Sequence, residues 1–376
     1  MFWGVLAALN VSAGVVVSSQ NDRLYDLETM MRWGRYWLVE GANIYEPGLW
    51  GSVDYPPNAI VLLSPLGVLS LDMAHPMWLL LNVGMAVAAP YFAARFMRPH
   101  DPFRVIVLPV LLFLCWGGVR TLTQFTLIAL TCSMVAMAIG VRRPVAGGVW
   151  LGLAMMKPQV AVPVFLWSVF TRRWTAALMS LAVVGALIGV FCLRSNAPPA
   201  WVATRYAETL AVHHTGEAIL AGISELRPMI RQAVSNVSEV DAIAVSLALG
   251  LIAGICVAGF QEGGRRKRVL YTAPPLVACW SLMTFYHLTY GFVILLPVLM
   301  LLALNDARRS TLRTSLFWLL QLGMMFDIPG LSRRAGLAGT PVFTNFLSHA
   351  DRALMIVLFV GLVALAWREA PDTTGA

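Results

Sequence analysis

The chain has 376 residues, of which 59% are apolar and only 12% are charged. A soluble domain carries roughly twice that fraction of charged residues, and the mean hydropathy here is +0.73. The composition therefore excludes a soluble globular protein and a disordered one, and it indicates a polytopic membrane protein. The formal net charge is +8, but no basic stripe alternates with aromatic residues, so we expect no nucleic-acid partner.

Apolar runs recur along the whole chain. Because a spanning helix needs about 20 residues, we predict one all-α domain over residues 1–376 with about twelve transmembrane helices in the lipid bilayer. The first run lacks a preceding basic segment and is predicted to be a crossing rather than a cleaved signal peptide. The cysteines lie inside apolar runs without a CxxC pair, which predicts neither a disulfide framework nor a zinc site. The predicted crossings fall at about 2–18, 77–95, 105–119, 124–140, 145–156, 159–171, 174–193, 241–260, 269–285, 290–305, 314–327 and 350–367.

Residues 57–71 determine how these crossings are oriented. If this segment returns to the face from which it came, most of the short basic connections lie in the cytoplasm, as membrane proteins prefer. Its prolines, among them Pro57 and Pro65, suit a broken helix buried against protein. We therefore predict a re-entrant element, cytoplasmic termini and two large outer loops, 19–76 and 194–240.

Each outer loop is predicted to contain an amphipathic helix. In the first loop an apolar stripe at helical spacing comprises Leu27, Met30, Met31, Gly34 and Leu38, and the charged residues off this stripe include Glu28, Arg32 and Arg35. This pattern is typical of a helix that lies along the membrane surface. A similar pattern covers about 200–226 and ends before Pro228.

Three residues near outer turns are candidates for binding an anion. Lys157 is one of only two lysines, and it lies between two apolar segments beside Pro158. Its ammonium group either reaches the interface or binds an anionic partner such as phosphate. Arg120 and Gln124 are four residues apart and share a face if helical, and a guanidinium can hold phosphate oxygens in a bidentate contact.

Two further residues are candidates for proton transfer. Asp26 begins the first amphipathic helix, where it either caps the helix or acts as a general base at the membrane surface. His287 lies among aromatic residues at an outer turn, where it is either structural or orients a substrate.

Several segments, taken in order, resemble one enzyme family. They are Asp26-LETMMRWGRYWLVE-Gly41-ANI-Tyr45, then Tyr55-Pro56-Pro57-NAIVLLSPLGVL, RTLTQFTLIAL, GGVWLGLAMMKPQVAVPVFLW and FYHLTYGFVILLPVLMLL. This series is similar to the GT-C glycosyltransferases of family 87, which include polyprenyl-phosphate-mannose-dependent mannosyltransferases. The resemblance runs from about residue 20 to about residue 300.

The resemblance implies a GT-C-like helical bundle in the plasma membrane, with its active site on the extracytoplasmic face. The donor would be a sugar on polyprenyl phosphate, and the acceptor would be a lipid-linked or outer-face glycan. Asp26 matches the catalytic aspartate of the family's first loop, and Lys157 matches a residue that faces the donor phosphate. The other expected substrate-binding residues are Arg120, Gln124, Tyr55 and Tyr45, with His287 beside the reacting groups.

We expect neither a cofactor nor a metal ion, because two cations can neutralise a monophosphate and no Asp-x-Asp cluster is present. The leading alternative is a lipid or glycolipid transporter, which would have the same hydropathy. A transporter predicts paired repeats and broken helices at the bilayer midplane, and the sequence contains no internal repeat. A membrane scaffold without catalysis is a second alternative, but it would not need an isolated lysine.

Overall fold

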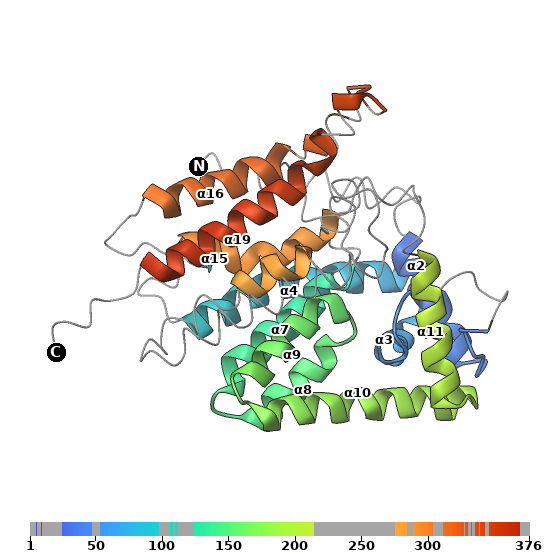
Figure 1. The fold of residues 1–376 in the computed structure, drawn as a ribbon. Coiled ribbons are helices and arrows are strands. Elements are labelled where there is room, and N and C mark those ends of the chain that lie inside the picture. Colours follow the sequence, from blue (N-terminus) through green and yellow to red (C-terminus); the bar gives the residue numbers. More distant parts are fainter. Residues whose placement is uncertain are drawn as a thin grey trace, which may run out of the picture.

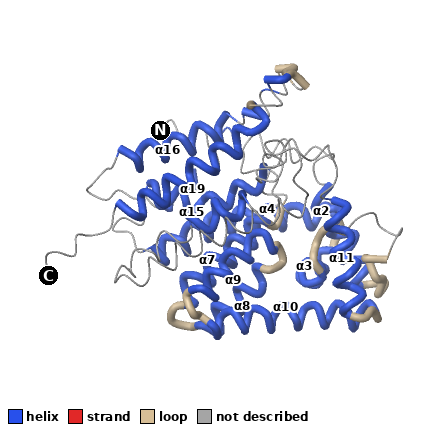
Figure 2. Tube along the Cα trace, viewed as in Figure 1, coloured by secondary structure: helices blue, strands red, loops and turns tan. Residues whose placement is uncertain are grey.

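The computed structural model describes most of the chain in seven stretches, and every regular element in them is helical. The stretches are 25–46, 53–97, 124–213, 275–283, 289–303, 311–326 and 346–368, with short pieces at 5, 9, 106–107, 110–111, 328–329, 332, 335–337 and 339–342. The predicted all-α class is therefore confirmed for this part of the chain. Figure 2 shows helices and connecting loops throughout the described trace.

Four consecutive helices form the layer that carries the candidate site. They are α7 (Thr126–Gly140), α8 (Pro144–Ala154), α9 (Pro158–Phe170) and α10 (Trp174–Ser195). In Figure 1 this layer lies along the lower edge of the molecule, coloured from teal to green.

Glycines let α8 lie very close to its two neighbours. A Cβ atom on Gly147 would come within 2.5 Å of the Cα of Gly140 in α7. A Cβ atom on Gly148 would come within 2.6 Å of the carbonyl oxygen of Ala176 in α10. Small residues at such interfaces allow helix backbones to approach inside a membrane, where helix association depends on close packing.

A second group of short elements covers one end of this layer. It comprises α2 (Tyr25–Leu38), α3 (Pro57–Leu63), the 3-10 helix η2 (Ser64–Val68) and α11 (Pro199–His213). Residues 57–68 thus form the short helix α3, which continues directly into the 3-10 helix η2, and the predicted re-entrant path of this element stays a prediction. The side of the membrane to which this element returns stays a prediction.

The apolar stripe predicted on α2 is present and is covered by protein. Leu27, Met30 and Met31 are buried. The stripe packs against η2 and α3, and a Cβ atom on Gly34 would come within 2.8 Å of the Cα of Ser64. That α2 lies along the membrane surface stays a prediction.

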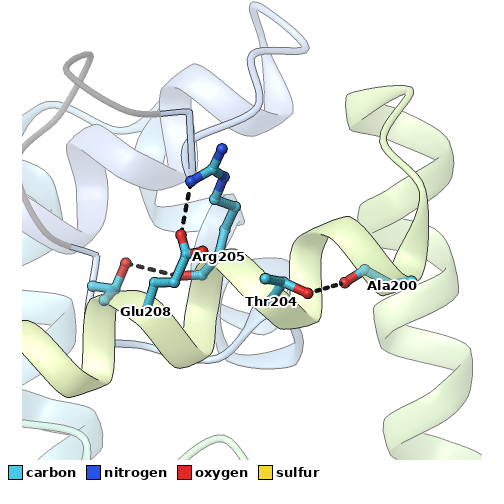
Figure 3. A network of polar contacts seen from close by, with 5 residues as sticks. Ala200, Thr204, Arg205 and Glu208 are labelled. Atoms are coloured by element: carbon cyan, nitrogen blue, oxygen red, sulfur yellow. Dashed lines mark hydrogen bonds and ion pairs between the residues drawn. The ribbon is translucent and has the colours of Figure 1, made fainter.

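Helix α11 confirms the described part of the second predicted amphipathic helix. Its exposed side carries an ion pair between Arg205 and Glu208, whose atoms lie 2.7 Å apart. The Thr204 hydroxyl donates to the carbonyl of Ala200 at 3.0 Å (Figure 3). Its other side brings Tyr206 against α2 and the loop that follows it.

The remaining described helices form a second layer beside the first (Figure 1). They are α4 (Leu71–Met97), α15 (Leu296–Ala303), α16 (Thr311–Phe326) and α19 (Ala350–Arg368), with the 3-10 helices η4 (Thr289–Leu295) and η5 (Leu347–His349). Helix α4 begins six residues before the predicted crossing, because the carbonyl of Ser70 accepts bonds from Met73 and Ala74 and starts the helix. The first predicted outer loop therefore ends at residue 70 rather than 76.

Three described segments are long and apolar enough to cross a membrane: Leu71–Phe96, Trp174–Ser195 and Leu347–Leu365. Helices α7, α8 and α9 are apolar but shorter, and so is the segment Phe292–Ala303. These segments agree with a membrane protein. The total of about twelve crossings stays a prediction, as does the first crossing, which lies largely outside the described residues.

Candidate anion site at the starts of two helices

Lys157 lies at the break between α8 and α9. Its carbonyl accepts bonds from Val160 at 2.9 Å and Ala161 at 3.2 Å and so begins α9, while Pro158 occupies the first helical position. Proline suits this position because the first helical N–H has no partner in the helix. The short sequence Lys-Pro therefore ends one helix, starts the next and fixes where the lysine backbone lies.

The ammonium group of Lys157 lies inside the protein. The residue is only 3% exposed, and Nζ donates to the hydroxyl oxygen of Thr126 at 2.5 Å. Nζ also lies 5.4 Å from the ring centre of Phe125, within the range of a cation–π contact. This position is inconsistent with a lysine that extends to the interface.

Two helix N-termini meet at this ammonium group. Thr126 is the first residue of α7, and Lys157 immediately precedes α9. Neither start has a side-chain cap or an acidic residue in its first turn. Helix N-termini carry partial positive charge and free N–H groups, which suit an anion such as phosphate.

Tyr55 and Gln124 contact each other beside Phe125, and their predicted roles in substrate binding stay predictions. The ring of Tyr55 lies 4.6 Å from that of Phe125, centre to centre. Its hydroxyl donates to Oε1 of Gln124 over a long 3.4 Å contact, and Gln124 is buried. The segment that includes the Tyr-Pro-Pro sequence thus packs directly against the start of α7.

Tyr45 holds that segment from the other side. Its hydroxyl donates to the carbonyl oxygen of Tyr55 at 2.5 Å, and its ring lies 5.5 Å from Phe191 and 6.1 Å from Tyr206. Burial, with smaller contributions from Tyr206 and Asp54, raises the pKa of Tyr45 well above its ordinary value. Tyr45 is therefore a neutral hydrogen-bond donor at physiological pH.

Helix α2 connects Asp26 to this cluster. Trp33 of α2 packs edge-on against Tyr55, with ring centres 5.8 Å apart. Asp26 lies in the first turn of α2, seven residues before Trp33, and two helical turns place both residues on the same side of the helix. Because α2 begins one residue before Asp26, this aspartate is not its N-cap. The Asp26 side chain lies outside the described structure.

The structure does not place Arg120 or His287, which lie outside the described residues. Their roles stay predictions. The structure therefore links Lys157 to Tyr55 through the ring of Phe125, and Tyr55 in turn contacts Gln124 and Tyr45. The sequence did not predict the parts that Phe125 and Thr126 play. The feature of the sequence that could have indicated Thr126 is a threonine near the start of an apolar run, two residues after Gln124.

Measured along the axis of α10, Lys157 lies well short of the C-terminal end of that helix at Ser195. A Cβ atom on Gly152 of α8 would come within 2.6 Å of the Cβ of Val183 in α10, which aligns the two helices. Lys157 follows Gly152 by five residues, whereas α10 continues for twelve residues beyond Val183 to Ser195. At 1.5 Å per residue, α10 extends roughly 10 Å past Lys157. Helices α2, α3 and α11 pack around this extension, so the site is recessed.

A small cavity lies further along α7 and α9 and does not include Lys157. Its lining is mostly apolar and includes Leu130, Met134, Val160, Val164 and Ser133. The buried Ser133 hydroxyl has no hydrogen-bond partner among the described residues. A space of this kind suits about one water molecule rather than a substrate.

Two other groups of buried polar side chains were not predicted from the sequence. At the start of α19, Arg352 is 1% exposed, donates to the carbonyl of Ser348 at 3.2 Å and contacts Nδ1 of His349 at 2.5 Å. On α4, His75, Trp78 and Asn82 each bury a polar atom. In both groups, charged or polar residues at the start of a long apolar run are the feature of the sequence that could have predicted them.

The family comparison covers most of this architecture. The model of glycosyltransferase family 87 matches residues 54–284, more than half of the chain. The match includes Tyr55, Arg120, Gln124 and Lys157, whereas Asp26, Tyr45 and His287 lie outside it. No curated protein and no solved structure matches the chain. The chain therefore belongs to glycosyltransferase family 87 and is a membrane glycosyltransferase.

Proposed function

We propose that the protein transfers a sugar from a polyprenyl-phosphate donor to a lipid-linked or outer-face glycan acceptor. The transferred sugar is mannose or another hexose or pentose, and transfer takes place at the extracytoplasmic face of the plasma membrane. One observation carries the proposal: a buried lysine ammonium group lies where two uncapped helix N-termini meet. This arrangement suits a phosphate within the membrane, and family membership favours sugar transfer over the transport alternative.

The charge of the donor changes during transfer, which gives Lys157 a catalytic role. The phosphodiester of the donor carries one negative charge, and the polyprenyl phosphate that leaves gains a second. A fixed cation in a site that excludes water therefore stabilises the transition state more than the bound donor. We assign this role to Lys157, with Arg120 as the second cation, and two such cations make a metal ion unnecessary in the proposed mechanism.

The proposed reaction is a direct displacement at the anomeric carbon. The acceptor hydroxyl oxygen attacks this carbon, and the carboxylate of Asp26 accepts the hydroxyl proton. A new bond forms between the acceptor oxygen and the anomeric carbon, while the bond to the phosphate oxygen breaks and its electron pair leaves with the phosphate. The anomeric configuration is inverted. General-base assistance contributes about 10²- to 10⁴-fold.

The remaining residues position the substrates. Tyr45 and Tyr55 hold the wall formed by the Tyr-Pro-Pro segment against the start of α7. Gln124 contacts Tyr55 of this wall, and we assign to its amide a hydrogen bond to a donor oxygen. His287 orients the substrate close to the reacting groups.

The proposal is tested with purified protein in lipid nanodiscs. Polyprenyl phosphates that carry different sugars are supplied with a glycolipid extract as acceptor, and both free polyprenyl phosphate and extended glycan are measured. At least one donor should yield both products in equal amounts. Release of neither product from any donor would contradict the proposal.

Lys157→Met tests the phosphate assignment, because methionine keeps the apolar contacts but removes the charge. We expect kcat/KM for the active donor to fall by about 10²-fold or more, as for loss of other groups that stabilise developing charge. Arg143→Met removes an exposed cation from the opposite end of α8 and is the matched control. Equal activity of the two variants would refute the role of Lys157.

A further inference from the structure

Helix α4 carries a stripe of buried polar atoms that have no hydrogen-bond partner among the described residues. They are Nε2 of His75, Nε1 of Trp78 and Oδ1 of Asn82. The three residues are spaced by three and four positions and therefore lie on one face of the helix. Trp78 is 2% exposed and Asn82 is fully buried. We call these three residues the α4 polar stripe.

The α4 polar stripe faces protein rather than lipid. On the neighbouring faces of the same helix, Met77, Leu80 and Val83 are 54%, 75% and 45% exposed, as expected for residues in contact with lipid. Each buried polar atom without a partner costs free energy, and inside a membrane no bulk water compensates for it. A series of three such atoms on one face therefore points to a bound group that the described part of the chain does not supply.

Two contacts show that α4 runs parallel to α7 and α9. The hydroxyl of Thr131 in α7 donates to the carbonyl of Met85 in α4 at 3.1 Å. Closer to the other end of α4, the ring of Phe96 lies 6.0 Å from that of Trp167 in α9. Together with the bond that joins the starts of α7 and α9, these contacts align all three helices.

This alignment places the α4 polar stripe beside the anion site. The start of α7 lies five residues before Thr131, and Lys157 lies ten residues before Trp167. Five residues before Met85 is residue 80 of α4, and ten residues before Phe96 is residue 86. The ammonium group of Lys157 therefore lies at the level of about residues 80 to 86 of α4. Asn82 falls within this range, and Trp78 lies one turn further toward the start of α4.

The chemistry of the stripe selects its ligand. The indole N–H of Trp78 can only donate a hydrogen bond, and Oδ1 of Asn82 can only accept one. A phosphodiester offers acceptors but no donors, a metal ion cannot contact an N–H group, and a hydrocarbon tail offers neither function. Hydroxyl groups both donate and accept, so two neighbouring hydroxyls satisfy both atoms.

We propose that the α4 polar stripe binds the hydroxyl groups of the transferred sugar. Trp78 donates to one hydroxyl oxygen, and Asn82 accepts from a neighbouring hydroxyl. His75 lies one turn further out and accepts or donates according to its tautomer. This inference rests on the proposed function and deepens it, because it assigns sugar selection to α4 and phosphate binding to Lys157.

The test uses two substitutions that replace these polar side chains with apolar ones, Trp78→Phe and Asn82→Leu. With the active donor, each should lower kcat/KM by about fivefold to tenfold, the usual value of one neutral hydrogen bond. Donors that lack one hydroxyl at a time identify the partner of each side chain. The wild-type protein should discriminate against the matching deoxy donor, and the variant should lose this discrimination. Ser133→Ala, which removes a buried hydroxyl outside the stripe, is the control.

The melting temperature gives a second measurement that does not depend on transfer. Without acceptor, the active donor should raise the melting temperature of the wild-type protein, and this rise should be smaller in Trp78→Phe and Asn82→Leu than in Ser133→Ala. The rise is the quantity compared, because Trp78→Phe also removes buried ring volume and Asn82→Leu also removes the bond that Nδ2 donates to the carbonyl of Trp78 at 3.0 Å. An equal rise in all these proteins would overturn the proposal.

The transfer assay separates the two proposals. Activity of the wild-type protein with unchanged discrimination in both variants would overturn the role of α4 alone, and an ordered water would then satisfy the stripe. Absence of transfer from every donor would overturn the proposed function, and the assignment of the stripe to a sugar would fall with it.

Discussion

Lys157 shows how local sequence produces a charged group inside a membrane protein. Proline at the next position ends the preceding helix, and the new helix begins on the carbonyl of the lysine itself. The side chain is then held by the hydroxyl of Thr126 and the ring of Phe125. A buried ammonium group is costly unless nearby groups or a ligand compensate for it, and this hydroxyl and this ring supply part of that compensation.

Asp26→Asn tests the proposed general base. Asparagine keeps the size and polarity of the side chain but cannot accept the proton at neutral pH, so we expect kcat to fall by about 10²- to 10⁴-fold with little change in donor affinity. Initial rates and donor binding in nanodiscs measure the two quantities. Glu28→Gln, an exposed acid on the same helix, should retain full activity. Full activity of Asp26→Asn would exclude this residue as the base.

Tyr45→Phe tests the hydrogen bond that holds the Tyr-Pro-Pro segment. Because burial raises the pKa of Tyr45, its contribution to stability is fully present below about pH 10, the pKa of tyrosine in an unfolded chain. The contribution is lost as the pH rises further, since the unfolded state then ionises first. In thermal unfolding in detergent between pH 8 and 11, the melting temperature should fall more steeply with pH for the wild-type protein than for Tyr45→Phe.

Tyr206 is the control for that experiment. Burial and Asp54 raise its pKa as well, so Tyr206→Phe should also flatten the alkaline loss of stability. Only Tyr45→Phe should lower transfer activity at pH 7, because only Tyr45 bonds to the Tyr55 carbonyl. Identical pH profiles for wild type and Tyr45→Phe would contradict the buried position of this phenol.

At the scale of elements, the turn after α2 is held by Arg194 of α10. Its guanidinium donates to the carbonyl of Leu38 at 3.0 and 3.3 Å and to that of Val39 at 3.1 Å. Gly41 then adopts φ of +68°, which other residues rarely adopt. This turn leads directly to Tyr45, so Arg194 positions one wall of the site from a distance.

Gly41→Ala should lower the free energy of unfolding by about 2 kcal/mol, in part from the left-handed backbone and in part from a collision with the guanidinium of Arg194. Thermal unfolding measures the change. In the background of Arg194→Ala the collision is absent, so the cost of Gly41→Ala should be smaller. Gly185→Ala in α10, where a Cβ atom meets no neighbour, should be neutral or stabilising. Strictly additive losses would contradict this interpretation.

The sequence predicts those elements whose pattern is local. Helix α2 follows from its apolar stripe, the broken 57–68 segment from its prolines, and the break at Lys157 from Pro158. Two features do not follow from a local pattern. Helix α4 starts at Leu71, ahead of its apolar run, and the α2 stripe packs against η2, which lies about 30 residues further along the chain. The α4 polar stripe was not predicted, because one Trp and one Asn in an apolar helix become informative only when their lack of partners is known.

At the scale of the whole molecule, the two ends of the α7–α10 layer are chemically different. One end carries Lys157 and the elements that cover it, whereas the turns at the other end carry Arg142, Arg143, Arg172 and Arg173. Arg173 stacks on Trp167 at 4.2 Å, and burial lowers its pKa to about 10, so it stays charged. This asymmetry supports the proposed orientation, with the basic end in the cytoplasm.

Cysteine labelling tests this orientation. Val39 and Val141 are 55% and 56% exposed and lie at opposite ends of the layer, so they form a matched pair. In a background with the five native cysteines replaced by alanine, a maleimide that cannot cross membranes should label Val39→Cys in intact cells. Val141→Cys should be labelled only after permeabilisation. The opposite result would invert the proposed topology.

The recess of roughly 10 Å between Lys157 and the end of α10 bears on the fate of the donor in the proposed reaction. Sugar phosphodiesters are activated, and bulk water competes with every acceptor for the anomeric carbon. If the proposed donor binds at Lys157, its reacting centre lies beneath three covering helices and meets few water molecules, so we expect slow hydrolysis in the absence of an acceptor. We also expect such a site to admit the acceptor as an extended chain, which would restrict the glycans that can be lengthened.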